Sequence, residues 1–228
     1  MVEVKIEDVW PLFGLRLRTP RLELRPVRDD DLPALVESAL AGIHDPERMP
    51  FGVPWTDAEP EELARSFAEY HWRNRVNTRA DRWGIQFAVF HGGRPIGIQE
   101  LHARDFAVLR TVESGSWLTR AHQGVGLGTE MRAGLLMFAF DILYAEWAQS
   151  SAAEWNRASL GVSDRLGYAR NGVNRVQSRP GEITNEIRLR LHRDAFARPD
   201  WRLAADGVEA ALRQLGVEER GNAGDQPH

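Results

Sequence analysis

The sequence predicts a mixed α/β fold with a mostly antiparallel sheet in one domain. Strand-like stretches at 83–90 and 95–101 are joined by a glycine turn, which predicts a hairpin, and a third strand is expected at 111–119. A glycine-rich loop follows, and residues 130–144 then carry apolar side chains at helical spacing. With 228 residues, the chain can bury a substantial core in one such domain.

The glycine-rich loop at 123–129 is the strongest functional signal in the chain. Its glycines, Gly124, Gly126 and Gly128, stand at alternate positions and lead directly into the predicted helix. Glycine lets backbone N–H groups approach a ligand closely, and the first turn of a helix offers unpaired N–H donors at the positive end of its dipole. The loop therefore predicts an anion site suited to a pyrophosphate, although a glycine turn without a ligand remains an alternative.

Two other nucleotide-binding motifs do not fit this loop. The phosphate loop of NTPases needs Gly-Lys-Ser/Thr, but Gly128 is followed by Thr129 and Glu130. The dinucleotide fingerprint needs Gly-x-Gly-x-x-Gly near the start of a domain, and its spacing differs from the one found here. The pattern that fits is Gln/Arg-x-x-Gly-x-Gly/Ala after a strand-like stretch at 112–118.

With this motif the sequence resembles the GNAT superfamily of acyl-CoA-dependent N-acyltransferases. Further motifs resemble its RimJ/RimL-like branch of ribosomal-protein acetyltransferases: the opening at 19–26, Asn156-x-x-Ser159, and Leu166-Gly167-Tyr168. The resemblance extends in motif order over about residues 19–191. It implies the GNAT fold, an α+β arrangement in which helices flank a mixed, mostly antiparallel central sheet with a splayed strand pair.

The resemblance also implies how coenzyme A is held. The loop would bind its pyrophosphate, and a bulge at Gly115 would free strand backbone to hydrogen-bond the pantetheine arm. For Asn156 and Ser159 a local alternative stays open, in which Asn156 is only a helix N-cap and Ser159 lies in the first turn. The implied cofactor-binding residues are Trp117, Leu118, Thr119, Gln123, Gly124, Val125, Gly126, Leu127, Gly128, Thr129, Asn156 and Ser159.

Direct acyl transfer to an amine is the chemistry that these features predict. The absence of cysteine excludes an acyl-cysteine intermediate. An amine must be neutral to attack a thioester, and amines titrate at about 8 to about 10.4, so a base is helpful. Glu113, Glu100 and His102 are candidate bases, and Glu113 is preferred because its strand leads to the loop, although it could also be a solvated strand residue. Ser159 is the expected donor of a proton to the leaving thiolate, and a backbone N–H near Trp117 would stabilise the oxyanion.

The donor and the acceptor stay open at this point. The predicted donor is acetyl-CoA or another short acyl-CoA, with succinyl-CoA included, and the acceptor is a protein N-terminus, a lysine or a small molecule. A dicarboxylic donor would need a cationic group at the acyl end, which arginines near the hairpins could supply. Two alternatives are a non-catalytic acyl-CoA-binding regulator and an antibiotic N-acyltransferase of the aminoglycoside type.

Composition favours a cytoplasmic protein without a nucleic-acid or membrane partner. Lysine and arginine total 29 against 33 acidic residues, a formal net charge of −4. No apolar run approaches the length of a membrane span, and the acidic N-terminus lacks the features of a secretion signal. The seven histidines form no metal-binding spacing, so no metal is expected.

The chain is expected to fall into three regions. Residues 1–16 form an apolar arm that packs on the domain or on a neighbouring subunit of a homo-oligomer, and residues 17–195 form the acyltransferase domain. Residues 196–228 hold a C-terminal helix at 200–215 and a disordered tail from 218.

The resemblance also implies that residues 42–75 lie over the acceptor side, which makes Phe51, Trp55 and Trp72 candidate walls of an acceptor cleft, with ordinary packing as the alternative. Patterns of apolar residues predict further strands at 17–26, 173–178 and 183–191 and further helices at 29–40, 60–75 and 156–166. A strand at 146–152 is expected mostly from the resemblance, because its residues have poor strand propensity.

Overall fold

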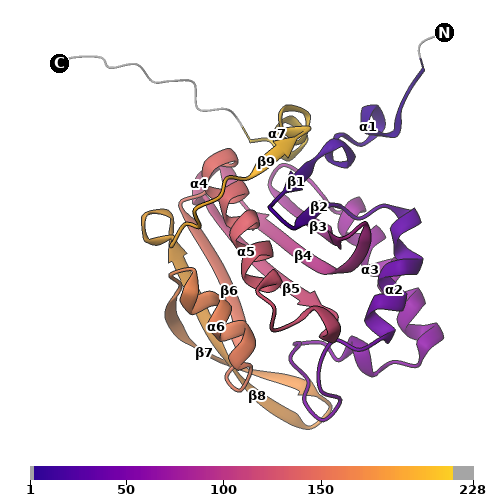
Figure 1. Cartoon of the computed structure of the whole chain (residues 1–228), viewed down its shortest axis with the longest axis vertical. Helices are drawn as coiled ribbons and strands as arrows, with labels where there is room; N and C mark the ends of the chain where they lie inside the picture. The colour runs from indigo at the N-terminus through magenta and orange to yellow at the C-terminus, as the bar shows by residue number, and fades with distance from the viewer. Residues whose placement is uncertain (1–2, 218–228) are drawn as a thin grey trace.

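A nine-stranded sheet in the order β7-β8-β6-β5-β4-β3-β2-β1-β9 runs through the computed structural model, which describes residues 3–217 (Figure 1). Antiparallel pairing joins every neighbouring pair except β5 and β6, which are parallel. The strands are β1 (Arg16–Arg18), β2 (Leu22–Pro26), β3 (Arg82–His91), β4 (Arg94–Arg104), β5 (Thr111–Leu118), β6 (Trp147–Ala153), β7 (Ala169–Arg179), β8 (Glu182–His192) and β9 (Ala204–Asp206).

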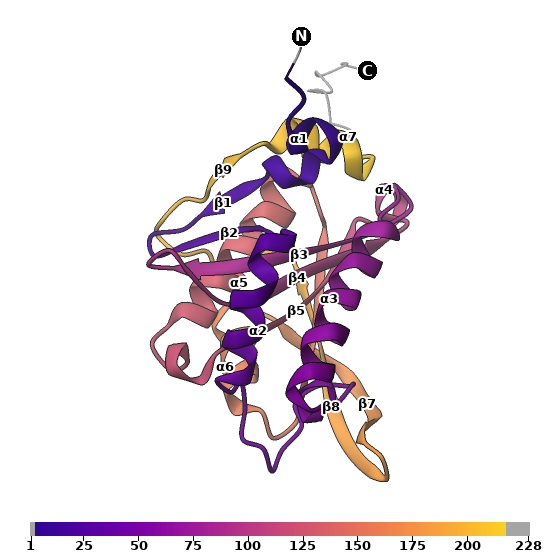
Figure 2. The same cartoon turned by 90° about the vertical axis from the view of Figure 1, so that its right-hand side faces the viewer.

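Helices cover both faces of this sheet. The α-helices are α1 (Ile6–Val9), α2 (Leu32–Leu40), α3 (Pro60–Val76), α4 (Phe106–Leu109), α5 (Leu127–Met137), α6 (Arg157–Arg165) and α7 (Val208–Leu215). Because side chains alternate along a strand, β3 sends Phe87 and Val89 into the main core with α5, and Ala88 into a second cluster with α2 and α3. Figure 2 shows α2 and α3 on the near side of β3, β4 and β5. The side of the sheet that α5 covers is called the α5 face, and the opposite side is called the α3 face.

The parallel strands β5 and β6 separate halfway along their length. They pair from Thr111↔Trp147 to Ser114↔Ser150, after which β5 continues against β4 and β6 continues against β8. The opening between residues 115–118 of β5 and 151–153 of β6 is called the strand fork, or simply the fork. The splayed strand pair expected from the family resemblance is therefore present.

The expected bulge at Gly115 is wrong. The pairing of β4 with β5 runs without a shift from His102↔Glu113 to Gly97↔Leu118, and Gly115 pairs with Glu100 in the regular register. The fork needs no extra residue. Strand β5 stays paired with β4 and strand β6 with β8, so the twist of the sheet can separate β5 from β6.

Most expected elements are confirmed, but the first strand is not a single one. The stretch at 17–26 forms a small hairpin of β1 and β2, with Leu17 opposite Leu24. Pro20 has no N–H to donate, and the Thr19 N–H closes the turn on the Leu22 carbonyl at 2.9 Å. Strand β6 is confirmed in spite of its small and polar residues.

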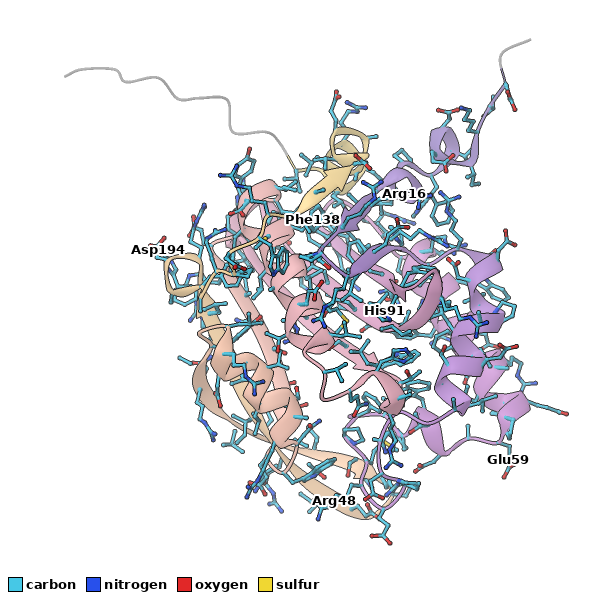
Figure 3. All side chains as sticks on the ribbon, in the orientation of Figure 1. Arg16, Arg48, Glu59, His91, Phe138 and Asp194 are labelled. Carbon is cyan, nitrogen blue, oxygen red and sulfur yellow. The ribbon has the colours of Figure 1, made fainter. Side chains whose placement is uncertain are left out.

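Two helices differ from the predicted ranges. The helix expected at 130–144 begins at Leu127, ends as α5 at Met137, and continues as a π-helical segment over Phe138–Ile142. Phe138 is fully buried in the main core and lies inside the molecule in Figure 3. The C-terminal helix begins only at Val208, because residues Ala204–Asp206 add strand β9 beside β1.

The turn from β9 into α7 depends on a glycine. Gly207 has a φ of +69°, and a Cβ there would lie 2.2 Å from the Gly14 carbonyl oxygen. A larger residue would separate the C-terminal segment from the N-terminal arm. The tail expected to be disordered from residue 218 lies outside the described residues.

The N-terminal arm packs on the domain itself. Leu12, Phe13 and Leu15 are buried, and the Leu12 N–H donates to the Gln214 side chain at 2.8 Å. Helix α1, strand β9 and helix α7 lie together at one end of the molecule (Figures 1 and 2). Within residues 3–217, no helix is both long enough and apolar enough to cross a bilayer.

Candidate active site

The glycine loop has the backbone of an open anion cradle. Gly124 and Gly126 have φ values of +76° and +86°, in the left-handed region that glycine adopts readily. A Cβ on Gly124 would meet nothing within 4 Å, and Val125 is 59% exposed, so the loop faces open space. Helix α5 begins directly after Gly126, so its first N–H groups have no carbonyl partner within the helix.

Gln123 fixes this loop to the end of β5. Its side-chain amide donates to the carbonyl oxygens of Ile43 and Leu118, each at 2.7 Å. Both bonds of the Gln123 amide group are thus made within the protein, and they hold the glycine loop in place. Contact of Gln123 with the cofactor stays a prediction. Leu127 is buried in the core and faces away from solvent.

Gly128 shows why the motif accepts glycine or alanine at its last position. A Cβ there would lie 3.8 Å from side-chain atoms of Leu118 and Val162, which is ordinary van der Waals contact. Its backbone φ also lies outside the left-handed region. The following residue, Thr129, lies in the first turn of α5 and is half-buried.

Arg21 brings a positive charge to the loop, and the sequence did not reveal it. Its Nε lies 2.6 Å from the Glu130 carboxylate, and its Nη1 donates to the Val125 carbonyl at 3.2 Å. Glu130 also accepts from the Thr19 hydroxyl at 2.6 Å and from the Arg21 N–H at 2.8 Å. Burial acts to raise the pKa of Glu130, but these hydrogen bonds outweigh it and the pKa is lowered. Glu130 thus holds Arg21 over the loop as a fixed cation.

Helix α6 starts at the open end of the fork, since it follows the end of β6. The Asn156 side chain accepts from the Ser159 N–H at 3.1 Å, so the local role of Asn156 as N-cap is confirmed. Ser159 lies half-buried in the first turn of α6. Binding of pantetheine by Asn156 and proton donation by Ser159 stay predictions.

A carboxylate lies against the first residue of the fork on the α3 face. Glu100 pairs with Gly115, so the two share a face, and a Cβ on Gly115 would be 3.4 Å from Glu100 Oε2. The Tyr70 hydroxyl donates to Glu100 Oε1 at 2.8 Å, and His102 Nε2 lies 3.3 Å from Oε2. Helix α3 and strand β4 together therefore hold the carboxylate over Gly115.

The environment of this carboxylate keeps it ionised. Burial acts to raise the pKa of Glu100, but the hydrogen bonds from His102 and Tyr70 and the nearby charge of His102 outweigh it, so the pKa is lowered. Burial and the neighbouring Glu100 charge raise the pKa of Tyr70, which therefore remains a neutral donor. The arrangement can accept a proton transiently while holding its geometry.

Glu113 lies on the same face but in a different setting. It is exposed and lines a cavity of about 210 Å³ between β5, β6, β7 and β8. The other residues around this cavity are mostly polar: Gln149, Ser150, Ser151, Asn171, Asn174, Glu186, Arg188 and Leu189. The expected place of Glu113 between the acyl group and the acceptor stays a prediction.

Aromatic side chains gather on the α3 face of β5. Trp117, expected at the cofactor, turns to the α3 face and lies 6.0 Å from Trp55 and 6.3 Å from Phe67 between ring centroids. Phe51 lies 5.5 Å from Trp55, so both predicted cleft walls belong to this group. Trp72 does not join them, since it is 46% exposed and donates to an Asp29 carboxylate oxygen on the surface.

A loop from Gly42 to Asp57, here named the clasp loop, bridges the glycine loop and the β7–β8 hairpin. At one end the Arg120 N–H donates to the Gly42 carbonyl at 3.0 Å. At the other end Arg179 forms two hydrogen bonds with the Asp57 carboxylate, at 2.6 and 3.0 Å, and one with the Pro46 carbonyl. Arg48, labelled in Figure 3 near the hairpin, lies over the Trp155 ring at 5.7 Å. The clasp loop thus crosses the open end of the fork.

Fold and site together define the class of protein, an acyltransferase that takes its acyl group from coenzyme A. The family model described as Acetyltransferase (GNAT) domain matches residues 21–169. This span is more than half of the chain and contains the glycine loop and the fork, and the chain belongs to the GNAT acetyltransferase family. It is therefore an acyl-CoA-dependent N-acyltransferase.

Its relatives include ribosomal-protein acetyltransferases. The Bacillus subtilis (strain 168) protein named "Putative ribosomal N-acetyltransferase YdaF" is 28% identical over 130 residues, which cover 57% of this chain and 67% of that protein. The structure of Mycobacterium smegmatis RimJ with CoA-disulfide matches with a TM-score of 0.68 at 19% identity, covering 91% and 96% of the two chains. RimL, a ribosomal-protein alpha-N-acetyltransferase in complex with coenzyme A, matches with a TM-score of 0.62 at 17% identity, covering 78% and 97%. At these identities the two structural matches confirm the fold alone.

Proposed function

We propose that this enzyme transfers a short acyl group from coenzyme A to the N-terminal amine of a protein. The observation that carries the proposal is the Glu100 carboxylate over Gly115, at the start of the fork where a thioester would lie. The names of the relatives, ribosomal N-acetyltransferase and ribosomal-protein alpha-N-acetyltransferase, support a protein amine as acceptor.

The proposed binding mode follows the open backbone of the site. The pyrophosphate lies on the amides of the glycine loop next to Arg21, where the helix dipole and the guanidinium both favour negative charge. The pantetheine arm lies in the fork and hydrogen-bonds residues 115–118 of β5 as a strand would. Asn156, at the start of α6, would bond the amides of the arm.

The proposed reaction is a direct attack on the thioester. The amine nitrogen reaches the thioester carbon from the α3 face and loses a proton to Glu100, while the carbonyl oxygen takes up negative charge. A backbone N–H of β5 near Trp117 stabilises this oxygen. The carbon–sulfur bond then breaks, and Ser159 gives a proton to the departing thiolate and regains one from solvent, to which Glu100 releases the proton of the amine.

A carboxylate base suits an α-amine better than a lysine. An α-amine titrates at about 7.7 to 8.0, so roughly a tenth of it is neutral at pH 7, whereas lysine at about 10.4 is almost entirely protonated. Any carboxylate is a weak base and therefore assists best where a larger share of the amine is already neutral. The polar cavity beside Glu113 has room for the first residues of an extended peptide.

A donor and acceptor panel tests this function. Thiol release from acetyl-CoA and succinyl-CoA would be followed with peptides bearing a free N-terminus, with N-acetylated peptides bearing one lysine, and with a polyamine and an aminoglycoside. The proposal expects the free N-terminal peptides to react fastest. Faster reaction of the lysine peptide or the aminoglycoside would show that the acceptor is not a protein N-terminus. Binding of coenzyme A without turnover of any amine would favour a non-catalytic regulator.

A further inference from the structure

A buried arginine lies across the start of the fork on the α5 face. Arg132 on α5 is 4% exposed, and its guanidinium donates to Ser116 Oγ at 3.0 Å and to Ser150 Oγ at 3.2 Å. Ser116 belongs to β5 just beyond the point where the strands separate, and Ser150 is the last β6 residue that pairs with β5. One guanidinium therefore touches both arms of the fork.

This cation has no carboxylate partner within residues 3–217. Its two hydrogen bonds reach neutral hydroxyls, and no ion pair of Arg132 occurs among these residues. Its Nε has no hydrogen-bond partner either, although the atom is fully buried. Removing an ion from water costs several kcal/mol unless an opposite charge and hydrogen bonds compensate it. Among residues 3–217 this buried positive charge thus has no direct counter-ion.

Further polar atoms around Arg132 are only partly satisfied. The Tyr168 hydroxyl lies close to Arg132 and Ser114 without a hydrogen bond of normal geometry. Gln99, which pairs with Ser116 on the same face, is fully buried, and its Oε1 has no partner. Arg132 Nε and the Tyr168 hydroxyl are thus donors without an acceptor among the described residues, whereas Gln99 Oε1 is an acceptor without a donor. The two unused donors suit an anionic group with several acceptor oxygens.

In the proposed binding mode the thioester lies at Gly115, and Arg132 contacts the adjacent Ser116, so the acyl chain beyond the thioester is the part of the ligand nearest to Arg132. An acetyl group would place a methyl against a guanidinium and hydroxyls and would leave their donors unused. A terminal carboxylate would neutralise the charge and accept the unused Nε and Tyr168 hydrogens. Resting on the proposed function, we infer that the acyl donor is a short dicarboxylic acyl-CoA and that Arg132 recognises its free carboxylate.

The reaction is unchanged by this donor. The amine nitrogen bonds to the thioester carbon, the carbon–sulfur bond breaks, and the amine proton leaves through Glu100. The thiolate takes a proton to give the free thiol, and the distal carboxylate stays ionised on Arg132. The product is an amide that ends in a carboxylate, so the modified amine changes from a positive charge to a negative one. Arg132 is thus a specificity-determining residue.

The arginines of the closing hairpin are less suited to this role. Arg190 lies over the Trp147 ring at 3.7 Å, and it pairs with Gln149 on the α3 face rather than under the fork. Arg188 lines the acceptor cavity next to Glu186. Arg132 on α5, and not an arginine of the hairpin, is therefore the candidate for binding a dicarboxylic acyl group.

Donor selectivity of the unmodified enzyme is the first test. Values of kcat/KM would be measured for acetyl-, butyryl-, malonyl-, succinyl- and glutaryl-CoA with one N-terminal peptide, and dissociation constants for succinyl- and butyryl-CoA by calorimetry. At least one dicarboxylic donor is expected to exceed butyryl-CoA, a neutral chain of similar length, by tenfold or more. Equal or better use of acetyl- and butyryl-CoA would overturn the inference while leaving the proposed function intact.

The Arg132→Met variant is the second test, with Arg190→Met as the matched control. Arg132→Met is expected to lose the dicarboxylic preference and to keep or improve turnover of butyryl-CoA, and Arg132→Lys should restore part of the preference. An equal loss for all donors would instead assign Arg132 to the oxyanion or to the fold, and would overturn the inference. If no donor is turned over, the proposed function fails, and calorimetry alone then decides: tighter succinyl-CoA binding supports the inference, and equal binding overturns it.

Discussion

Glu100 Oε2 lies 3.4 Å from the point where a Cβ on Gly115 would stand. Glycine therefore keeps the carboxylate within reach of the fork, and the Tyr70 and His102 side chains hold it there. This relationship selects Glu100 as the proposed base over Glu113, which is exposed on the same face.

Glu100→Gln is expected to lower kcat by about 10²- to 10⁴-fold, the range of general base catalysis, with little change in coenzyme A affinity. The amide keeps the size of the side chain but cannot take up the proton. Steady-state kinetics with an N-terminal peptide would measure the effect. Glu113→Gln serves as the comparison, and a larger loss in that variant would return the role to Glu113.

A negative charge on the glycine loop is expected to weaken coenzyme A binding. Val125→Glu places a carboxylate on an exposed side chain, and two like charges 4 Å apart repel by about 1 kcal/mol in water, so the dissociation constant should rise about five- to tenfold. The effect should shrink at high salt. Gly126 is less suitable for this test, because its φ of +86° strains any other residue.

Calorimetric titration with coenzyme A measures that change directly. Val108→Glu, at an 82% exposed position on α4, carries the same charge away from the loop and should bind as the unmodified protein does. Equal affinities in both variants would place the pyrophosphate elsewhere.

Loss of the clasp between Arg179 and Asp57 is expected to affect the acceptor more than the donor. The pair is near the surface, so Arg179→Leu should change the free energy of unfolding by only about 1 kcal/mol or less. The KM for the peptide should rise severalfold, because Phe51 and Trp55 of the clasp loop lie on the α3 face from which the amine is proposed to enter, while coenzyme A affinity should change less. Arg198→Leu breaks a similar two-bond pair with Asp141 and is the control. A peptide KM that both variants leave unchanged would refute a role for the clasp.

His71 is expected to make the protein less stable in acid. Burial lowers the pKa of His71 to about 4, from an ordinary value of 6.5, and neither ring nitrogen has a partner within residues 3–217. Above pH 6.5 the imidazole is neutral in both states and has no effect. As the pH falls below 6.5, the unfolded chain binds a proton that the folded one refuses, so stability falls by about 1.4 kcal/mol per unit until about pH 4.

Urea unfolding of the wild type and of His71→Leu would reveal this contribution. Between pH 7 and pH 5 the wild type should lose about 2 kcal/mol more than the variant, since only it carries the buried imidazole. The comparison cancels the contributions of carboxylates that do not interact with His71; Glu100, whose charge acts on His71, is not among them. Equal losses in the two proteins would mean that His71 does not control acid stability.

The sequence predicted the parts of the site that local patterns encode. The glycine loop, the helix after it and the Asn156 cap depend on neighbouring residues, so spacing alone identified them. Contacts between distant positions were not predictable in this way. Arg21 reaches Glu130 across 109 residues, and the pairing of Tyr70 with Glu100 depends on how α3 packs on β4.

Backbone details were missed for similar reasons. The turn at Pro20 lies within an alternating apolar pattern, so the pattern alone predicted one strand instead of the β1–β2 hairpin. Arg132 lies within a helix whose other buried positions, apart from Glu130, are not charged, and only its burial against both arms of the fork distinguishes it from a surface arginine.

A crystal structure of the protein with coenzyme A would show whether the glycine loop and the fork hold the cofactor. The diphosphate is expected on the main-chain amides of residues 124–128, with the pantetheine arm in the fork along residues 115–118 of β5. A diphosphate bound at any other place, with the fork closed by its own side chains, would contradict this binding mode.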